Sequence, residues 1–244
     1  MNQSELEAMD WGIPTEAVVE AFARAAEQGD GLKTLNLWVH PPLSDGCLRH
    51  LSTLVARSKL QTLDMALRED EGRVQILESI PWAHLRVLNI SIGGGTFLES
   101  TMKALVEGIQ RWQRRYQMKQ QQQPVKAIPP GLEDFLLVKN LGSPLLMTRG
   151  DPLPTFLATL SLKSLQLRAI MDPEQALSLL QVVDVSRLQL LALLLPDADS
   201  TRVERILNGL QHAKELQTLI LWGATISEEQ IERMNAKGVT LQSK

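Results

Sequence analysis

The sequence predicts an α/β fold built from about seven stacked strand–helix repeats, and two observations indicate it. An apolar signature, Leu-x-x-Leu-x-Leu with other apolar residues allowed, recurs seven times, and the stretches between the copies carry a helical period. Leucine accounts for 43 of the 244 residues, whereas aromatic residues make up only 4%. This composition is not that of an average mixed domain. We therefore attribute the leucine excess to an internal repeat.

The seven signatures keep a nearly constant distance along the chain. They are Leu32-Leu35-Leu37, Leu60-Leu63-Met65, Leu85-Leu88-Ile90, Leu132-Phe135-Leu137, Leu162-Leu165-Leu167, Leu188-Leu191-Leu193 and Leu216-Leu219-Leu221. Their first positions are 28, 25, 47, 30, 26 and 28 residues apart, so that only one step departs from the common period. We expect one repeat domain over residues 1–244.

Each signature predicts a short strand, because its fourth and sixth positions point to the same side of an extended chain. The stretches between signatures have apolar residues at helical spacing, as in Met102, Leu105, Val106 and Ile109. Capping boxes are predicted at Asp172–Gln175, Thr201–Glu204 and Ser227–Gln230. Neither element buries its apolar face alone, so neighbouring repeats must stack.

The ends and the long step add further elements. We expect a capping helix over 15–29, a last helix over Ser227–Lys237 and a short strand at Val239–Leu241. The long step contains a basic, Gln/Pro-rich insertion, residues 110–131, with a charge of +5. It predicts a helix that overshoots its repeat and then a mobile loop, because prolines stop the helix. A second loop is expected over Gly142–Pro154.

The Leu-x-x-Leu-x-Leu strand followed by a helix resembles the ribonuclease-inhibitor-like class of leucine-rich repeats, over roughly Leu32 to Lys244. The resemblance implies a horseshoe with parallel strands on the concave face and helices on the convex face. Family members usually carry Asn or Cys three residues after the sixth position, and here only Asn140 matches. Such irregular repeats are similar to those of F-box-type leucine-rich-repeat proteins, many of them fungal. Too few residues precede Thr15 for an F-box.

Several classes of protein are disfavoured. No apolar run approaches the ~18 residues of a membrane span, and the polar, acidic residues 1–10 indicate neither a secretory signal nor a transit peptide. The single cysteine, Cys47, cannot form an internal disulfide, and it falls on a predicted helix facing the core. We expect an intracellular, cytoplasmic or nuclear protein.

Motifs for chemistry are weak. Gly93-Gly94-Gly95-Thr96 follows a strand and could bind an anion, but it lacks the P-loop lysine pattern, and a strand–helix turn needs glycine anyway. The histidines do not pair with metal ligands, and no Gly-x-Ser-x-Gly elbow occurs. We expect no enzyme activity, no cofactor, no metal and no small-molecule substrate.

The insertion suggests a nucleic-acid hypothesis, because rings are interleaved with cations that could grip a phosphate backbone. The cations are Arg111, Arg114, Arg115 and Lys119. The alternative is a solvated helix extension, and the formal net charge of −3 weighs against nucleic acid.

The face opposite the core is the best-supported site. Its predicted residues are polar in repeats one, two, three and five, apart from Trp38, Ala66 and Val87, and apolar in the others. The apolar ones are Leu136, Val138, Leu190, Ala192, Leu194, Ile220 and Trp222, with Arg168 beside them. Repeat six also fits the register Leu190-Leu193-Leu195, which leaves Ala192 and Leu194 on the same face. Trp38, isolated at the other end, either joins a partner site or shields the first repeat.

This apolar face has the composition of a protein-interaction hot spot. The alternative is that one of the two predicted loops covers it. We expect a non-catalytic module that binds an unidentified protein through the concave face. By resemblance, substrate recognition in ubiquitin ligation is conceivable. Alternatives are a regulator of an enzyme such as a small GTPase, which would use a charged rim, and a nucleic-acid-associated protein using the insertion.

Overall fold

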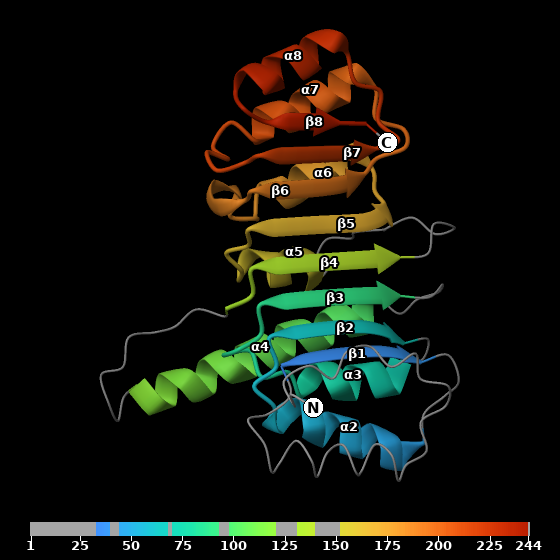
Figure 1. Ribbon diagram of the computed structural model, residues 1–244, viewed down its shortest axis with the longest axis vertical. Coiled ribbons are helices and arrows are strands. Elements are labelled where there is room, and N and C mark those ends of the chain that lie inside the picture. Colours follow the sequence, from blue (N-terminus) through green and yellow to red (C-terminus); the bar gives the residue numbers. More distant parts are fainter. Residues whose placement is uncertain are drawn as a thin grey trace, which may run out of the picture. The chain divides into compact units, whose positions relative to one another are not determined.

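The computed structural model describes residues 33–39, 44–67, 70–92, 98–120, 131–139 and 152–243. The chain divides into two compact units, Met1–Leu132 and Glu133–Lys244, called here the N-terminal and the C-terminal unit. In both units parallel strands alternate with helices, and the strand order follows the chain order (Figure 1). The expected α/β class is confirmed.

The N-terminal unit pairs three parallel strands, β1 (Thr34–Val39), β2 (Thr62–Leu67) and β3 (Val87–Ile92). Its helices are α2 (Asp45–Arg57), α3 (Asp70–Glu78) and α4 (Leu98–Gln120). The register places the signature leucines of successive repeats side by side, Leu35 beside Leu63 and Leu63 beside Leu88. All three are buried, as the strand period requires.

The C-terminal unit pairs five parallel strands, each with the next along the chain. They are β4 (Asp134–Lys139), β5 (Ser164–Ile170), β6 (Leu190–Leu194), β7 (Thr218–Trp222) and β8 (Thr240–Gln242). The helices are α5 (Pro152–Ala158), α6 (Pro173–Leu180), the 3-10 helix η1 (Val185–Arg187), α7 (Ser200–Gly209) and α8 (Glu228–Ala236).

The core of the C-terminal unit lies between these strands and helices. In β6 the buried signature residues are Leu191 and Leu193, so the first of the two registers considered for repeat six is correct. From the helix side, Leu179 of α6 and Ile206 of α7 are fully buried. Successive strand residues alternate between this core and the opposite face, which is where the candidate site lies.

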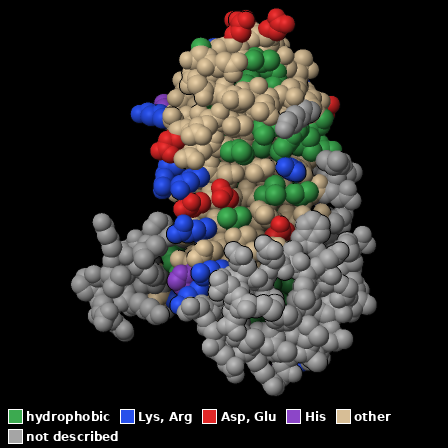
Figure 2. Space-filling view, viewed as in Figure 1, with side chains coloured by type: hydrophobic (Ala, Val, Ile, Leu, Met, Phe, Trp, Pro, Cys, Tyr) green, Lys and Arg blue, Asp and Glu red, His purple; other side chains and the backbone are tan. Residues whose placement is uncertain are grey.

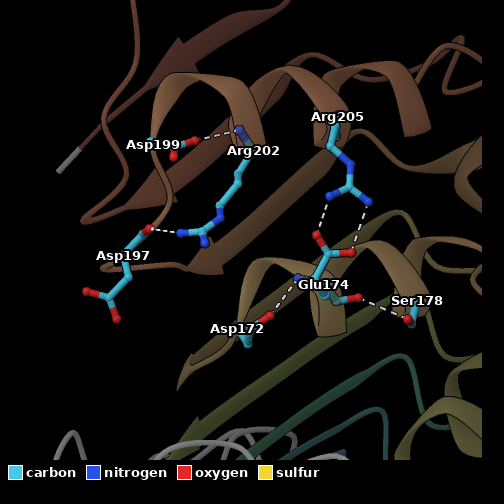
Figure 3. Close-up of polar contacts among 7 residues, drawn as sticks. All are labelled: Asp172, Glu174, Ser178, Asp197, Asp199, Arg202 and Arg205. Atoms are coloured by element: carbon cyan, nitrogen blue, oxygen red, sulfur yellow. Dashed lines mark hydrogen bonds and ion pairs between the residues drawn. The ribbon is translucent and has the colours of Figure 1, made fainter.

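Two of the three predicted capping boxes are confirmed, at Asp172–Gln175 and Ser227–Gln230. The box at Thr201–Glu204 is wrong. The N-cap of α7 is Asp199, whose carboxylate accepts a hydrogen bond of 2.8 Å from the backbone N–H of Arg202 (Figure 3). Aspartate caps at least as well as threonine, and it comes two residues earlier. Thr201 therefore lies inside the first turn.

The predicted last helix and final strand are present as α8 and β8. The helix expected to overshoot its repeat is α4, which has 23 residues and ends at Gln120. Part of the loop expected over Gly142–Pro154 is instead helical, because α5 begins at Pro152 and proline suits a first helical turn. The predicted capping helix over 15–29, the loop residues 121–130 and residues 142–151 lie outside the described residues.

Candidate partner-binding surface

Apolar side chains from β4–β7 share the face that points away from the core, together with polar residues such as Gln166 and Arg168 of β5. The apolar side chains are partly buried and come from four consecutive strands, and we call this set the apolar patch. Its members are Leu136, Val138, Ile170, Leu190, Leu194, Ile220 and Trp222. Hydrophobic side chains gather over these strands in the space-filling view (Figure 2). Of the seven apolar residues that the sequence predicts on this face, strand alternation places six in the patch, and Ala192 is the exception.

The strand register sets the rows of this surface. Leu194 of β6 is paired with Trp222 of β7, and Ala192 is paired with Ile220. On the other side, Val138 of β4 is paired with Arg168 of β5. The apolar residues of β6 and β7 are therefore paired with each other, whereas Leu136 and Val138 of β4 are paired with the polar Gln166 and Arg168 of β5.

Arg168 is the cation of this surface. Its side chain is exposed, and its guanidinium carbon lies 5.1 Å from the centroid of the Trp222 ring. Arg168 is in β5 and Trp222 is in β7, so the side chain passes over β6. Two strand spacings amount to about 9.6 Å, a distance that a long arginine side chain spans together with the indole ring.

A β-bulge places Arg168. The pairing of β5 with β6 shifts between Leu167 and Ile170, which leaves Arg168 and Ala169 without partners on β6. Bulges bend a strand and redirect its side chains, and they are frequent next to functional sites. After the bulge, Ile170 is paired with Leu194, so that Ile170, Leu194 and Trp222 form one row.

Ala192 departs from the expectation. It has its place on this face, between Gln166 and Ile220 in the register, but it is fully buried. Its methyl group is the shortest side chain of the row and lies below the tips of longer neighbours. Ala192 therefore forms the floor of the surface and offers a partner no contact.

The acidic residue described on this face of the C-terminal unit, Asp134, lies at the beginning of β4. Burial raises the pKa of Asp134, the neighbouring Glu133 raises it further, and Lys163 opposes both. Lys163 itself pairs with Glu133 at 2.9 Å. Asp134 precedes Val138, which is level with Arg168, by four residues, or about 13 Å along the strand.

Sequence reasoning missed Ile170. Ile170 lies beyond the seventh position of its repeat, the last position from which residues of this face are predicted. The continued alternation of β5, in which Arg168 is exposed, Ala169 buried and Ile170 partly buried, could have identified it. Trp38 lies in β1 of the N-terminal unit, and its side chain lies outside the described residues.

In the N-terminal unit, one row of the face opposite the core is polar. Asn36, Asp64 and Asn89 occupy one row of β1–β3, and the Asn89 side-chain amide donates to the Asp64 carboxylate at 3.3 Å. All three are partly buried. This row is polar, unlike the row of Ile170, Leu194 and Trp222 in the C-terminal unit.

The cations of the nucleic-acid hypothesis are not equivalent. Arg111 forms an ion pair of 3.1 Å with Glu78, so it links α4 to α3. Arg114 and Arg115 are exposed, whereas the side chain of Lys119 lies outside the described residues. One of the four cations therefore has a structural partner already.

The other candidates for chemistry add no site. Cys47 is buried in α2, as predicted. Among the described residues, no three His, Cys, Asp or Glu side chains are grouped so that they could hold a metal ion. Gly93–Thr96 lies outside the described ranges.

No protein-family model matches the chain, and a search of curated proteins finds no match. None of the described helices combines the length and the apolar character that crossing a membrane requires. Function must therefore be argued from the side chains of the surface.

Proposed function

We propose that the chain is a non-catalytic, intracellular module that binds a partner protein through the apolar patch. We also propose that its strand–helix repeats are leucine-rich repeats, in which this face would be the concave one. The observation that carries the proposal is the set of partly buried apolar side chains on one face of β4–β7, with Arg168 exposed beside Trp222.

The composition of the surface supports this function. Interface cores are enriched in aromatic residues and arginine, and tryptophan and arginine are frequent among the residues whose truncation costs most affinity. The face combines one of each with aliphatic neighbours from all four strands. Covering the part of these apolar side chains that is still in water would be favourable, because burying apolar surface lowers the free energy.

Crosslinking pull-down from cell lysate tests the proposal with three chains: the wild type, the double variant Leu194→Asp/Trp222→Arg, and the control Val182→Asp. Val182 is a 43% exposed hydrophobic residue just after α6, outside the patch. We expect a set of proteins that the wild type and the control both recover and that the double variant loses.

Circular-dichroism spectra and melting curves of the three chains establish that each is folded. If the folded double variant recovers the same proteins as the wild type, the patch is not the binding surface. If the control loses the same proteins, the effect comes from introducing a charged side chain at any surface position rather than from the patch.

A further inference from the structure

We infer that the partner is a protein segment that places a carboxylate on Arg168 and apolar side chains on the surrounding patch. This inference rests on the proposed function and specifies the chemistry of its partner. It follows from how Arg168 is positioned, from the absence of a partner for its charge among the described residues, and from the apolar surroundings.

Arg168 is positioned before any partner arrives. The bulge of β5 separates it from the β6 ladder, and the Trp222 ring contacts its guanidinium at 5.1 Å. A guanidinium on an aromatic ring keeps the N–H groups of its edges available for a carboxylate. Less side-chain entropy is then lost when that carboxylate binds, because the arginine is already held.

The guanidinium of Arg168 has no hydrogen-bond acceptor among the described residues of the C-terminal unit. The other arginines described there all donate hydrogen bonds: Arg187 to Ser161, Arg202 to the Asp197 carbonyl, Arg205 to Glu174 and Arg233 to Glu204. Arg168 contacts a ring instead. Among the described residues of the C-terminal unit, it is the arginine without an acceptor.

The surroundings favour a carboxylate over a polyanion. A nucleic-acid backbone is held by several cations along its phosphates, and here Lys163, just before β5, already pairs with Glu133. A single arginine matches a single carboxylate, which it binds with two parallel hydrogen bonds. Apolar neighbours lower the local dielectric and strengthen that pair. Asp or Glu between apolar residues supplies both kinds of contact.

Selection from a random peptide display library tests the inference with the full chain as bait. The wild type is compared with Arg168→Gln, Arg168→Glu and the Leu194→Asp/Trp222→Arg variant. We expect the wild type to enrich peptides with Asp or Glu flanked by apolar residues. A selected peptide should bind Arg168→Gln about 10- to 100-fold more weakly, the cost of losing a charged hydrogen-bond pair. Exchanging its acid for Lys should restore binding to Arg168→Glu.

The outcomes separate this inference from the proposed function. Peptides that need Leu194 and Trp222, but carry no acid and bind Arg168→Gln as tightly as the wild type, overturn the inference alone. Peptides that bind the double variant equally well, or no enrichment at all on the wild type, count against the patch itself. Arg168 is exposed, so its variants should keep the wild-type melting temperature within a few degrees, and that measurement accompanies each comparison.

Discussion

The guanidinium of Arg168 lies over the ring of Trp222, although the two residues belong to strands that are not neighbours in the sheet. The contact bridges β5 and β7 across β6. The cation and the aromatic ring of this face are therefore in contact. The contribution of each side chain to stability should depend on the presence of the other.

A double-mutant cycle of Arg168→Gln and Trp222→Leu measures this dependence. We expect a coupling free energy of about 0.5–1 kcal/mol in urea unfolding, the range of cation–π pairs at exposed sites. A coupling free energy indistinguishable from zero would mean that the two side chains do not interact in solution. The same cycle on Arg168 and Val182, which are not in contact, should be additive.

Gly223, immediately after Trp222, should not tolerate alanine. Its φ is +75°, and an added Cβ would lie 2.9 Å from the Pro196 Cα. We expect Gly223→Ala to lower the free energy of unfolding by more than the roughly 1 kcal/mol of a left-handed alanine. Gly238→Ala is the matched control, since its φ is +77° but nothing lies within 4 Å of the added Cβ. Equal losses in chemical denaturation would show that Pro196 moves aside.

Glu204 and Asp134 should have opposite effects on the pH dependence of stability. A hydrogen bond from Arg233 holds the pKa of Glu204 below its ordinary value, and one from Gln230 adds to the effect. The stabilising contribution of Glu204 is therefore present above the unfolded-state pKa and lost as pH falls through the folded-state pKa. Burial raises the pKa of Asp134, so the protonated form is favoured in the folded state and stability is lost as pH rises through the folded-state pKa.

Unfolding free energies between pH 3 and pH 7 test both statements. Glu204→Gln should be less stable than the wild type at pH 7, with the difference shrinking in acid. Asp134→Asn should be more stable than the wild type at pH 7, and this difference should also shrink in acid. The same sign for both variants at pH 7 would contradict one of the two assignments.

Two buried serines, Ser52 in the middle of α2 and Ser58 at its C-cap, form another matched pair. The Ser52 hydroxyl has no hydrogen-bond partner among the described residues, whereas the Ser58 hydroxyl donates to the Val55 carbonyl at 2.9 Å. Ser52→Ala should leave stability unchanged or raise it slightly, because alanine favours the helix and no bond is lost. Ser58→Ala should cost about 1 kcal/mol. A large loss in thermal unfolding of Ser52→Ala would reveal a partner for its hydroxyl.

The sequence predicts on which face of a strand a residue lies when that depends only on local periodicity. Leu191 and Leu193 are buried and Leu190 and Leu194 lie on the opposite face because side chains alternate along any strand. The bulge at Arg168 could not be predicted in this way, since it is a relation between two strands rather than a property of one. The contact with Trp222 and the place of Ile170 beside Leu194 both depend on it.

Ion pairs between neighbouring helices could not be predicted from the sequence either. Glu204 resembled the last residue of a capping box, yet it bonds Arg233, 29 residues away on the next helix. Arg111 resembled part of a basic surface, yet it pairs with Glu78. A charged side chain on a helix has several acceptors within reach, and the choice depends on how neighbouring helices pack.

The apolar patch draws its residues from four strands that are joined only through their neighbours. A ligand that contacts all four strands β4–β7 binds only while they are paired. Its binding free energy would therefore oppose the separation of those strands. Amides of β6, at the centre, would gain hydrogen-exchange protection even where the ligand touches none of their side chains. Partner binding would thus make the unfolding of these four strands more cooperative.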